Sequence, residues 1–231
     1  STYGSMAVDN GTLYTSDYDG NLSAHDVSDG SLKWIRNTGV EEGSPAVKHG
    51  IVYVASEGTD PFLWALDAET GETIWTYSSD EVYGGYVGLS VTEDTVYAQS
   101  CGDAMYAVDA QTGDEQWVRE GIGCAYDISE PTVVGNIVYA TRYNAETLGL
   151  NRETGETVHT ITNPAGCKFG APIPYRGMLL MADRYCSGEL SAYGGVEYPR
   201  FTPLVVEEDV ESTFNISKEY RDEPIDNASV S

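Results

Sequence analysis

The chain has 231 residues and a formal net charge of −25, from 37 acidic against 12 basic side chains. So few Lys and Arg side chains argue against nucleic acid as a partner, because affinity for nucleic acid comes mainly from cations that neutralise phosphates. An anionic membrane surface is disfavoured for the same reason, and no apolar run approaches the roughly 18 residues that indicate a membrane-inserted segment.

The acid-rich, Lys-poor composition resembles that of proteins from extreme halophiles, in particular salt-accumulating archaea. A large surplus of one sign destabilises a compact chain through self-repulsion. That repulsion is weaker in strong salt, where the Debye length falls to about 3 Å at 1 M. An ordinary acidic secreted protein is the alternative, and neither origin says what the chain does.

One sequence pattern recurs five times along the chain. The first three copies hold a strand with a hydrophobic–Tyr pair, a hairpin, a strand of small and apolar residues that ends in Asp, a turn with Gly, and a Trp; the fourth has Asn151 and His159 in place of the Asp and the Trp. The turn glycines of the first four copies are Gly30, Gly71, Gly113 and Gly155, whereas the fifth copy is worn. A repeat of about 40–45 residues with four short strands is typical of a β-propeller. We therefore predict an all-β propeller of four-stranded antiparallel blades, at residues 1–39, 40–79, 80–120, 121–163 and 164–195.

The second copy illustrates how the residues specify a blade. Its apolar and β-branched runs predict strands at residues 44–49, 51–55, 62–66 and 72–77, separated by turn and loop residues. The Asp before each turn can accept hydrogen bonds from backbone N–H groups two residues on. The recurrence of Trp34, Trp75 and Trp117 predicts that they pack between adjacent blades. His159 takes the same place in the fourth copy, where we expect a packing residue and not a catalytic base.

The pattern resembles that of the PQQ-repeat, quinoprotein-like β-propellers. The resemblance is carried best by Val52-Tyr53 through Trp75 and by Val96-Tyr97 through Trp117, and it covers about residues 1–195. Propellers of this superfamily usually close with seven or eight blades, whereas five repeats are visible here. The sequence therefore fits either a complete five-bladed ring or part of a larger one, and its start without Met predicts a processed chain or a segment of a longer protein.

The resemblance implies a fold and leaves the activity open. Dehydrogenases of the superfamily carry a pair of adjacent cysteines, a Trp that stacks on the quinone, and an Asp beside a bound calcium ion. None of these residues can be matched to a position in this sequence. We therefore predict no catalytic, cofactor-binding or metal-binding residue, with PQQ and calcium unsupported, and assign the chain to the non-enzymatic branch.

The four cysteines lie at matched positions of the repeat. Cys101 and Cys186 fall at the hairpin between the second and third strands, and Cys124 and Cys167 fall in the segment that leads into a first strand. These loops emerge on one face of a propeller, so we expect the disulfides Cys101–Cys124 and Cys167–Cys186 and an oxidising exterior. Sequence cannot choose among the three possible connectivities, and four separate buried thiols are the alternative.

Four Asn-x-Ser/Thr triplets are candidate N-glycosylation sites. They begin at Asn10, Asn21, Asn215 and Asn227. Each triplet is weak evidence by itself. Together with the cysteines they favour an extracellular or cell-surface location.

Two segments depart from the repeat and are candidate binding loops. Residues 80–88 place Tyr83 and Tyr86 among glycines, where they could stack on a sugar or a peptide, although a connector with buried rings is the alternative. Residues 17–21 alternate oxygen-bearing side chains in the manner of a calcium loop. We favour a simple hairpin there, because Asp-Gly between two strands is a standard hairpin signal.

After the repeats, residues 196–231 predict a β-rich tail or a linker into a further module. Residues 201–209 and 211–217 have the composition of two β segments, whereas residues 218–231 are polar without an apolar period. The tail could lend a strand to a neighbouring subunit, and a disordered end is the alternative.

These features lead to one expected function and two alternatives. We expect an extracellular, non-catalytic propeller that serves as a protein-interaction or structural module of a cell-surface assembly, with other protein subunits as partners. Self-assembly through the tail would be one route to such an assembly. The alternatives are a fragment of a PQQ-dependent dehydrogenase, and a propeller that binds carbohydrate or peptide through Tyr83 and Tyr86.

Overall fold

A computed structural model describes most of the repeat region and two segments of the tail. The described residues are 6–39, 43–55, 60–79, 87–100, 104–123, 130–142, 144–163, 166, 170–182, 190–194, 214–220 and 223–230. Every regular element among them is a β-strand, which confirms the predicted fold class. Within these residues no helix is long and apolar enough to cross a membrane.

Four of the five sheets are four-stranded and antiparallel, with their strands in sequence order. The first contains β1 (Ala7–Asp9), β2 (Thr12–Ser16), β3 (Asn21–Asp26) and β4 (Leu32–Asn37). The second contains β5 (Ala46–Lys48), β6 (Ile51–Ala55), β7 (Leu63–Asp67) and β8 (Thr73–Tyr77). The third contains β9 (Val87–Val91), β10 (Thr95–Ser100), β11 (Ala104–Asp109) and β12 (Glu115–Glu120). The fourth contains β13 (Thr132–Val134), β14 (Ile137–Thr141), β15 (Glu146–Asn151) and β16 (Thr157–Thr162).

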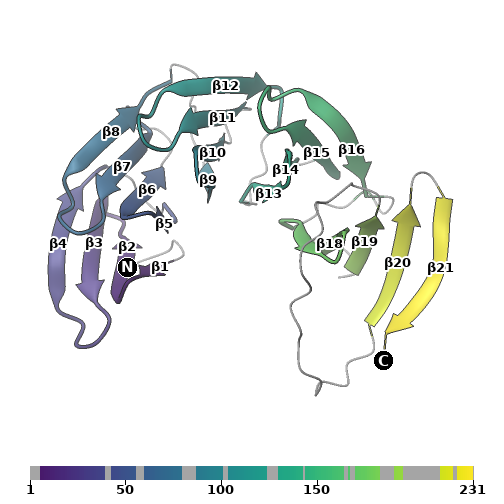
Figure 1. Ribbon diagram of the computed structural model, residues 1–231, viewed down its shortest axis with the longest axis horizontal. Helices are drawn as coiled ribbons and strands as arrows, with labels where there is room; N and C mark the ends of the chain where they lie inside the picture. Colours follow the sequence, from purple (N-terminus) through teal and green to yellow (C-terminus); the bar gives the residue numbers. More distant parts are fainter. Residues whose placement is uncertain are drawn as a thin grey trace.

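The sheets are arranged side by side as blades in an arc (Figure 1). The first strand of each blade lies on the inside, where β1 contacts β5 and β5 contacts β9. The fourth strands, such as β8 and β12, lie on the outside (Figure 1). The first and fifth sheets stand at opposite ends of the arc, so these five sheets do not form a closed five-bladed ring.

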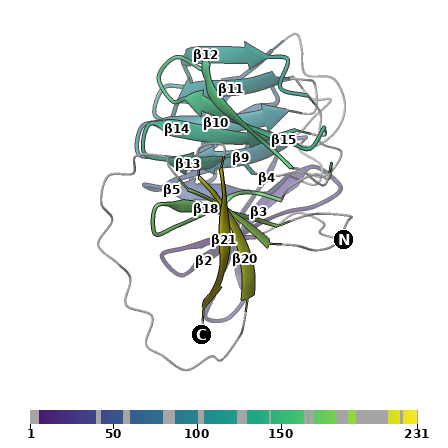
Figure 2. The ribbon, with the colours of Figure 1, turned by 90° about the vertical axis from the view of Figure 1, so that its right-hand side faces the viewer.

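The fifth sheet differs from the others. Its repeat strands are β17 (Ile173–Tyr175), β18 (Met178–Ala182) and β19 (Leu190–Gly194), and the tail adds β20 (Phe214–Tyr220) and β21 (Glu223–Val230). β20 pairs with β19 in parallel, whereas all other neighbours in the sheets are antiparallel. Figure 2 views this end of the arc, with β20 and β21 as its last two strands. The tail therefore pairs with the chain's own fifth sheet.

β6 shows why these residues form propeller strands. All five of its residues are buried, which an unbroken apolar run predicts for a strand covered on both faces. Because successive side chains point to opposite faces, Val52 and Val54 pack against the first sheet, while Ile51, Tyr53 and Ala55 pack against the third. The core is accordingly a series of apolar layers, one between each pair of neighbouring sheets.

Candidate functional site

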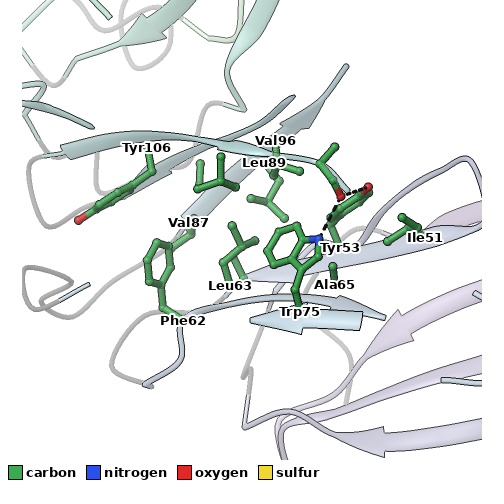
Figure 3. Packing of buried hydrophobic residues seen from close by; sticks show 14 of the residues in the cluster. Ile51, Tyr53, Phe62, Leu63, Ala65, Trp75, Val87, Leu89, Val96 and Tyr106 are labelled. Carbon is green, nitrogen blue, oxygen red and sulfur yellow. Dashed lines mark hydrogen bonds between the residues drawn. The ribbon is translucent and has the colours of Figure 1, made fainter. Parts of the chain in front are cut away.

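The interfaces between blades repeat one arrangement, which we call the aromatic clamp. A Tyr and a Trp of one sheet both donate hydrogen bonds to one backbone carbonyl of the next sheet. Between the second and third sheets, Tyr53 Oη and Trp75 Nε1 each lie 3.0 Å from the carbonyl oxygen of Ala110 (Figure 3). The other two clamps are formed by Tyr14, Trp34 and the Ala68 carbonyl, and by Tyr97, Trp117 and the Arg152 carbonyl. This confirms that the repeated Trp side chains pack between adjacent blades.

The turn glycines complete the clamp. Gly113 has φ of +76°, a conformation that side chains other than glycine rarely adopt. A Cβ atom at Gly113 would lie 2.7 Å from the indole of Trp75, so the ring packs directly on the glycine backbone. Gly71 meets Trp34, and Gly155 meets Trp117, in the same way. Trp and turn Gly therefore recur together because each blade places its indole on the turn of the next.

The Asp before each turn holds the turn backbone. Asp67 Oδ1 accepts hydrogen bonds from the backbone N–H groups of Glu69 and Thr70, at 3.0 and 2.8 Å. Asp109 accepts the equivalent pair, and Asn151 does so in the fourth sheet with its amide oxygen. The predicted structural role of this position is confirmed.

These hydrogen bonds predict an acid dependence of stability. The backbone N–H groups of Thr70 and Thr112 lower the pKa of Asp67 and Asp109, because they stabilise the carboxylate. The contribution of these hydrogen bonds to the free energy of unfolding is complete above the Asp pKa of the unfolded chain, about 3.9. It is lost as the pH falls through the lower pKa of the folded protein. In urea unfolding, we expect the Asp67→Asn, Asp109→Asn variant to fold, as Asn151 does naturally, and to lose less stability than the wild type between about pH 4 and pH 2. A variant with exposed Glu69→Gln and Glu72→Gln has the same net charge and controls for the loss of two carboxylates. A slope of the Asp67→Asn, Asp109→Asn variant no smaller than that of this control would contradict the assignment.

The fourth interface has an aromatic pair with His159 in place of the indole. His159 replaces Trp, and its ring lies 5.5 Å from that of Tyr139, centroid to centroid. A Cβ atom at Gly149, where the other sheets have Ala, would lie 2.5 Å from the imidazole. Burial lowers the pKa of His159, so the folded protein favours the neutral ring. The contribution of this buried ring to stability therefore falls as the pH drops below the His pKa of the unfolded chain, about 6.5. The expectation of a packing residue is confirmed.

Ion pairs add to the contacts between sheets. The guanidinium of Arg152 donates to Tyr97 Oη at 3.0 Å and pairs with the carboxylate of Asp94 in the third sheet. Lys48 pairs with Glu93 at 2.6 Å across the second interface. These charged side chains therefore connect neighbouring sheets of the propeller.

Most residues singled out from the sequence lie outside the described part of the chain. This holds for the four cysteines and for Tyr83 and Tyr86, and only the backbone is described at Asn215 and Asn227. Asn10 is exposed in the β1–β2 turn. The Asn21 side chain instead donates to Asp17 Oδ2 at 3.2 Å and accepts from Asn37 at 3.0 Å.

Residues 17–21 form the hairpin turn between β2 and β3. Asp17 Oδ1 accepts hydrogen bonds from the backbone N–H groups of Asp19 and Asn21, both at 2.9 Å. Across the described residues, no group of three or more His, Cys, Asp or Glu side chains could hold a metal ion. The Trp rings of the clamps are buried against the turn glycines.

The face of the first sheet that points away from the second was not singled out from the sequence. It contains a groove of about 410 Å³, which we call the open face and which is lined by Val8, Leu13, Thr15, His25, Asp26, Val27 and Gly30. The signal was present in the repeat: Thr15 and His25 are polar at positions where the second sheet has Val54 and Leu66, both fully buried. Comparing the copies position by position would have found this face.

Comparison with known proteins gives one family and several relatives. Residues 1–193 match the family model described as outer membrane protein assembly factor BamB. The chain is 26% identical over 191 residues to the outer membrane protein assembly factor BamB of Yersinia pestis, covering 76% of this chain and 47% of that protein. It is 28% identical over 204 residues to the tetrathionate hydrolase of Acidithiobacillus ferrooxidans, covering 77% of this chain and 40% of that protein.

The solved structures support the fold. The crystal structure of BamB from Moraxella catarrhalis superposes with a TM-score of 0.65 at 19% identity, covering 84% of this chain and 61% of that one. The chain spans less than half the length of the two curated relatives. Likeness at this level extends to the propeller architecture and not to the relatives' activities.

Proposed function

The chain belongs, over residues 1–193, to the family described as outer membrane protein assembly factor BamB, and we propose on this basis that it is a protein-binding module of a cell-envelope assembly. The module is non-catalytic and acts outside the cytoplasm, at the cell surface. Its partners are other protein subunits. The observation that carries the proposal is this match, which extends over all five repeats.

The described structure supports the proposal by accounting for the repeated residues. The Tyr, Trp, Asp and Gly of the pattern are engaged in the clamps and turns, as at Tyr53, Trp75, Asp109 and Gly113. A rigid scaffold of this kind presents its loops and end faces to partners. We also propose that the loop with Tyr83 and Tyr86 is a binding loop and that Cys101–Cys124 and Cys167–Cys186 are disulfides. The tail is proposed as a route to assembly with other subunits.

An extracellular location also makes the sequons relevant. Asn10 is the acceptor that the geometry favours, because it is exposed in a turn and its Nδ2 donates only to the neighbouring Asp9 carboxylate at 3.0 Å, whereas both polar atoms of the Asn21 amide are hydrogen-bonded to other residues of the hairpin and β4. Glycosylation at Asn10 would leave the blade interfaces undisturbed.

The test compares protein binding with quinone chemistry. Immobilised chain is exposed to envelope proteins from the source cells, and each retained protein is then purified and its affinity measured by calorimetry. We expect a defined stoichiometry and a dissociation constant in the micromolar range or tighter, with no oxidation of alcohols when PQQ and Ca²⁺ are added. A Trp75→Ala variant, which loses a clamp, should bind more weakly if the partner recognises the assembled arc.

Two results would overturn the proposal. One is stoichiometric PQQ binding with turnover of an alcohol. The other is the absence of any retained protein of defined stoichiometry, together with binding of a glycan that a Tyr83→Ala, Tyr86→Ala variant loses.

A further inference from the structure

The layer between the fourth and fifth sheets has polar residues where the other layers have large apolar ones. Thr147 on β15 is fully buried, and the residues at the same repeat position in the first three sheets are Leu22, Leu63 and Met105, which are also fully buried. In the same layer, His159 stands where those sheets have an indole. Both changes replace an apolar side chain by a smaller one with a hydrogen-bonding atom.

The strand register gathers the polar side chains on one face of the fourth sheet. Thr141 and Thr147 are directly paired, and Gly149, two residues along β15 from Thr147, is paired with His159. Tyr139, two residues before Thr141 on β14, packs against β18 of the fifth sheet. Because side chains alternate between the faces of a strand, the two threonines also face the fifth sheet. The layer is therefore enclosed by described strands on both sides.

Three buried polar atoms of this face have no hydrogen-bond partner among the residues that the structure describes. They are Thr141 Oγ1, Thr147 Oγ1 and His159 Nε2. Thr141 is 1% exposed and Thr147 is 0% exposed, so solvent at the surface does not reach their hydroxyls. Buried polar groups in folded proteins are normally paired, because an unpaired one destabilises the fold. The Cβ atoms of directly paired residues lie about 4.5–5.5 Å apart, so one small molecule can reach both hydroxyls.

The chemistry of the three atoms indicates which ligand they would hold. Burial alone lowers the pKa of His159, so no neighbouring charge among the described residues acts on its ring. An ion in this layer would be buried without a counter-charge, which costs far more than burying a neutral molecule. Threonine hydroxyls both donate and accept hydrogen bonds, and a neutral imidazole nitrogen does one or the other. A ligand hydroxyl group is complementary to all three.

We propose that the layer between the fourth and fifth sheets binds a small neutral hydroxylic ligand, water or a short diol, through Thr141, Thr147 and His159. Leu179 and Met181 of β18, which belong to the same cluster and are fully buried, form the apolar wall. A few convergent polar groups in an apolar lining are typical of small-molecule sites, and buried water forms about three hydrogen bonds to such groups. The site goes beyond the proposed function, which involves no ligand inside the propeller.

The order of stability of Thr and Val at position 147 tests this site. Val has the shape of Thr without the hydroxyl, so Thr147→Val removes a hydrogen bond to the ligand and leaves the ligand incompletely paired. We expect the thermal unfolding midpoint to fall by about 2–4 °C. In a dry layer, the same substitution would remove an unpaired hydroxyl and raise the midpoint.

Leu63, the counterpart of Thr147 in the second sheet, provides the matched control. Its layer has Ala55 and Trp75 at the positions of Thr141 and His159, so a hydroxyl there would meet no ligand. We expect Leu63→Thr to have a lower midpoint than Leu63→Val. The order of Thr and Val should therefore reverse between positions 63 and 147.

Two measurements on the folded protein identify the ligand. Magnetic relaxation dispersion of the solvent water detects water molecules that stay bound, and the Thr141→Val, Thr147→Val variant should lose a part of this signal that Leu63→Val keeps. A diol instead gives a saturable shift of the His159 ring resonances when ethylene glycol is added, and the double variant should lack it. A higher midpoint for Val than for Thr at both positions would overturn the proposal, and so would the finding that neither signal depends on the two hydroxyls.

Discussion

Replacing Trp75 by Ala is expected to lower the free energy of unfolding by about 3–5 kcal/mol, the range typical of large aromatic truncations in cores. The indole packs on Gly113 and against Tyr53, and its N–H is bonded to the Ala110 carbonyl. The substitution therefore removes packing and a hydrogen bond from the interface between the second and third sheets. Urea unfolding followed by far-ultraviolet circular dichroism measures the loss.

A neighbouring residue on the same strand serves as the control. Ile74 is 45% exposed on β8, so Ile74→Ala should cost about 1 kcal/mol or less. If both substitutions had similar costs, Trp75 would not be a clamp residue. A large loss at Trp75 alone supports a core that consists of layers between sheets.

The second large effect is expected at the glycine under that indole. Gly113→Ala combines the strain of a non-glycine residue at φ of +76°, about 1–2 kcal/mol, with overlap between the new methyl group and the Trp75 ring, a further 1–3 kcal/mol. We expect a total of about 3 kcal/mol, measured by the same urea unfolding.

Gly30→Ala separates these two contributions. Gly30 has a φ of +75°, and a new methyl group there would meet no atom of the described residues within 4 Å, so only the strain of about 1–2 kcal/mol applies. The difference between the two glycines reports the contact with the next blade. Equal costs at both positions would show that the turn glycines serve the backbone conformation alone.

The sequence predicted the scaffold well because the repeat presents each requirement several times. The strand 51–55, the turn role of Asp67 and the packing of Trp75 each follow from a pattern seen in at least three copies. His159 was interpreted correctly for the same reason, since it stands where three sheets have Trp. Repetition therefore identified the residues that form the blade interfaces.

The structural features that the sequence did not predict lie where the repeated pattern ends or changes. β21 (Glu223–Val230) was missed because an outer strand pairs through backbone groups, which a polar sequence also provides. The parallel pairing of β19 with β20 has no signal in the repeat, because no other described blade contains it. The open face was missed because its signal is a difference between copies, Thr15 and His25 in place of Val54 and Leu66, and does not lie in the repeated pattern itself.

The measurement that tests the clamp most directly is a double-mutant cycle of Trp75→Ala and Gly113→Ala. If the indole lies on the glycine, removing the ring relieves the overlap, and Gly113→Ala should then cost only the backbone strain of about 1–2 kcal/mol, about 2 kcal/mol less than in the wild type. Such coupling would place the recurring aromatic and glycine residues in the scaffold. Additive costs, within about 0.5 kcal/mol, would contradict the account.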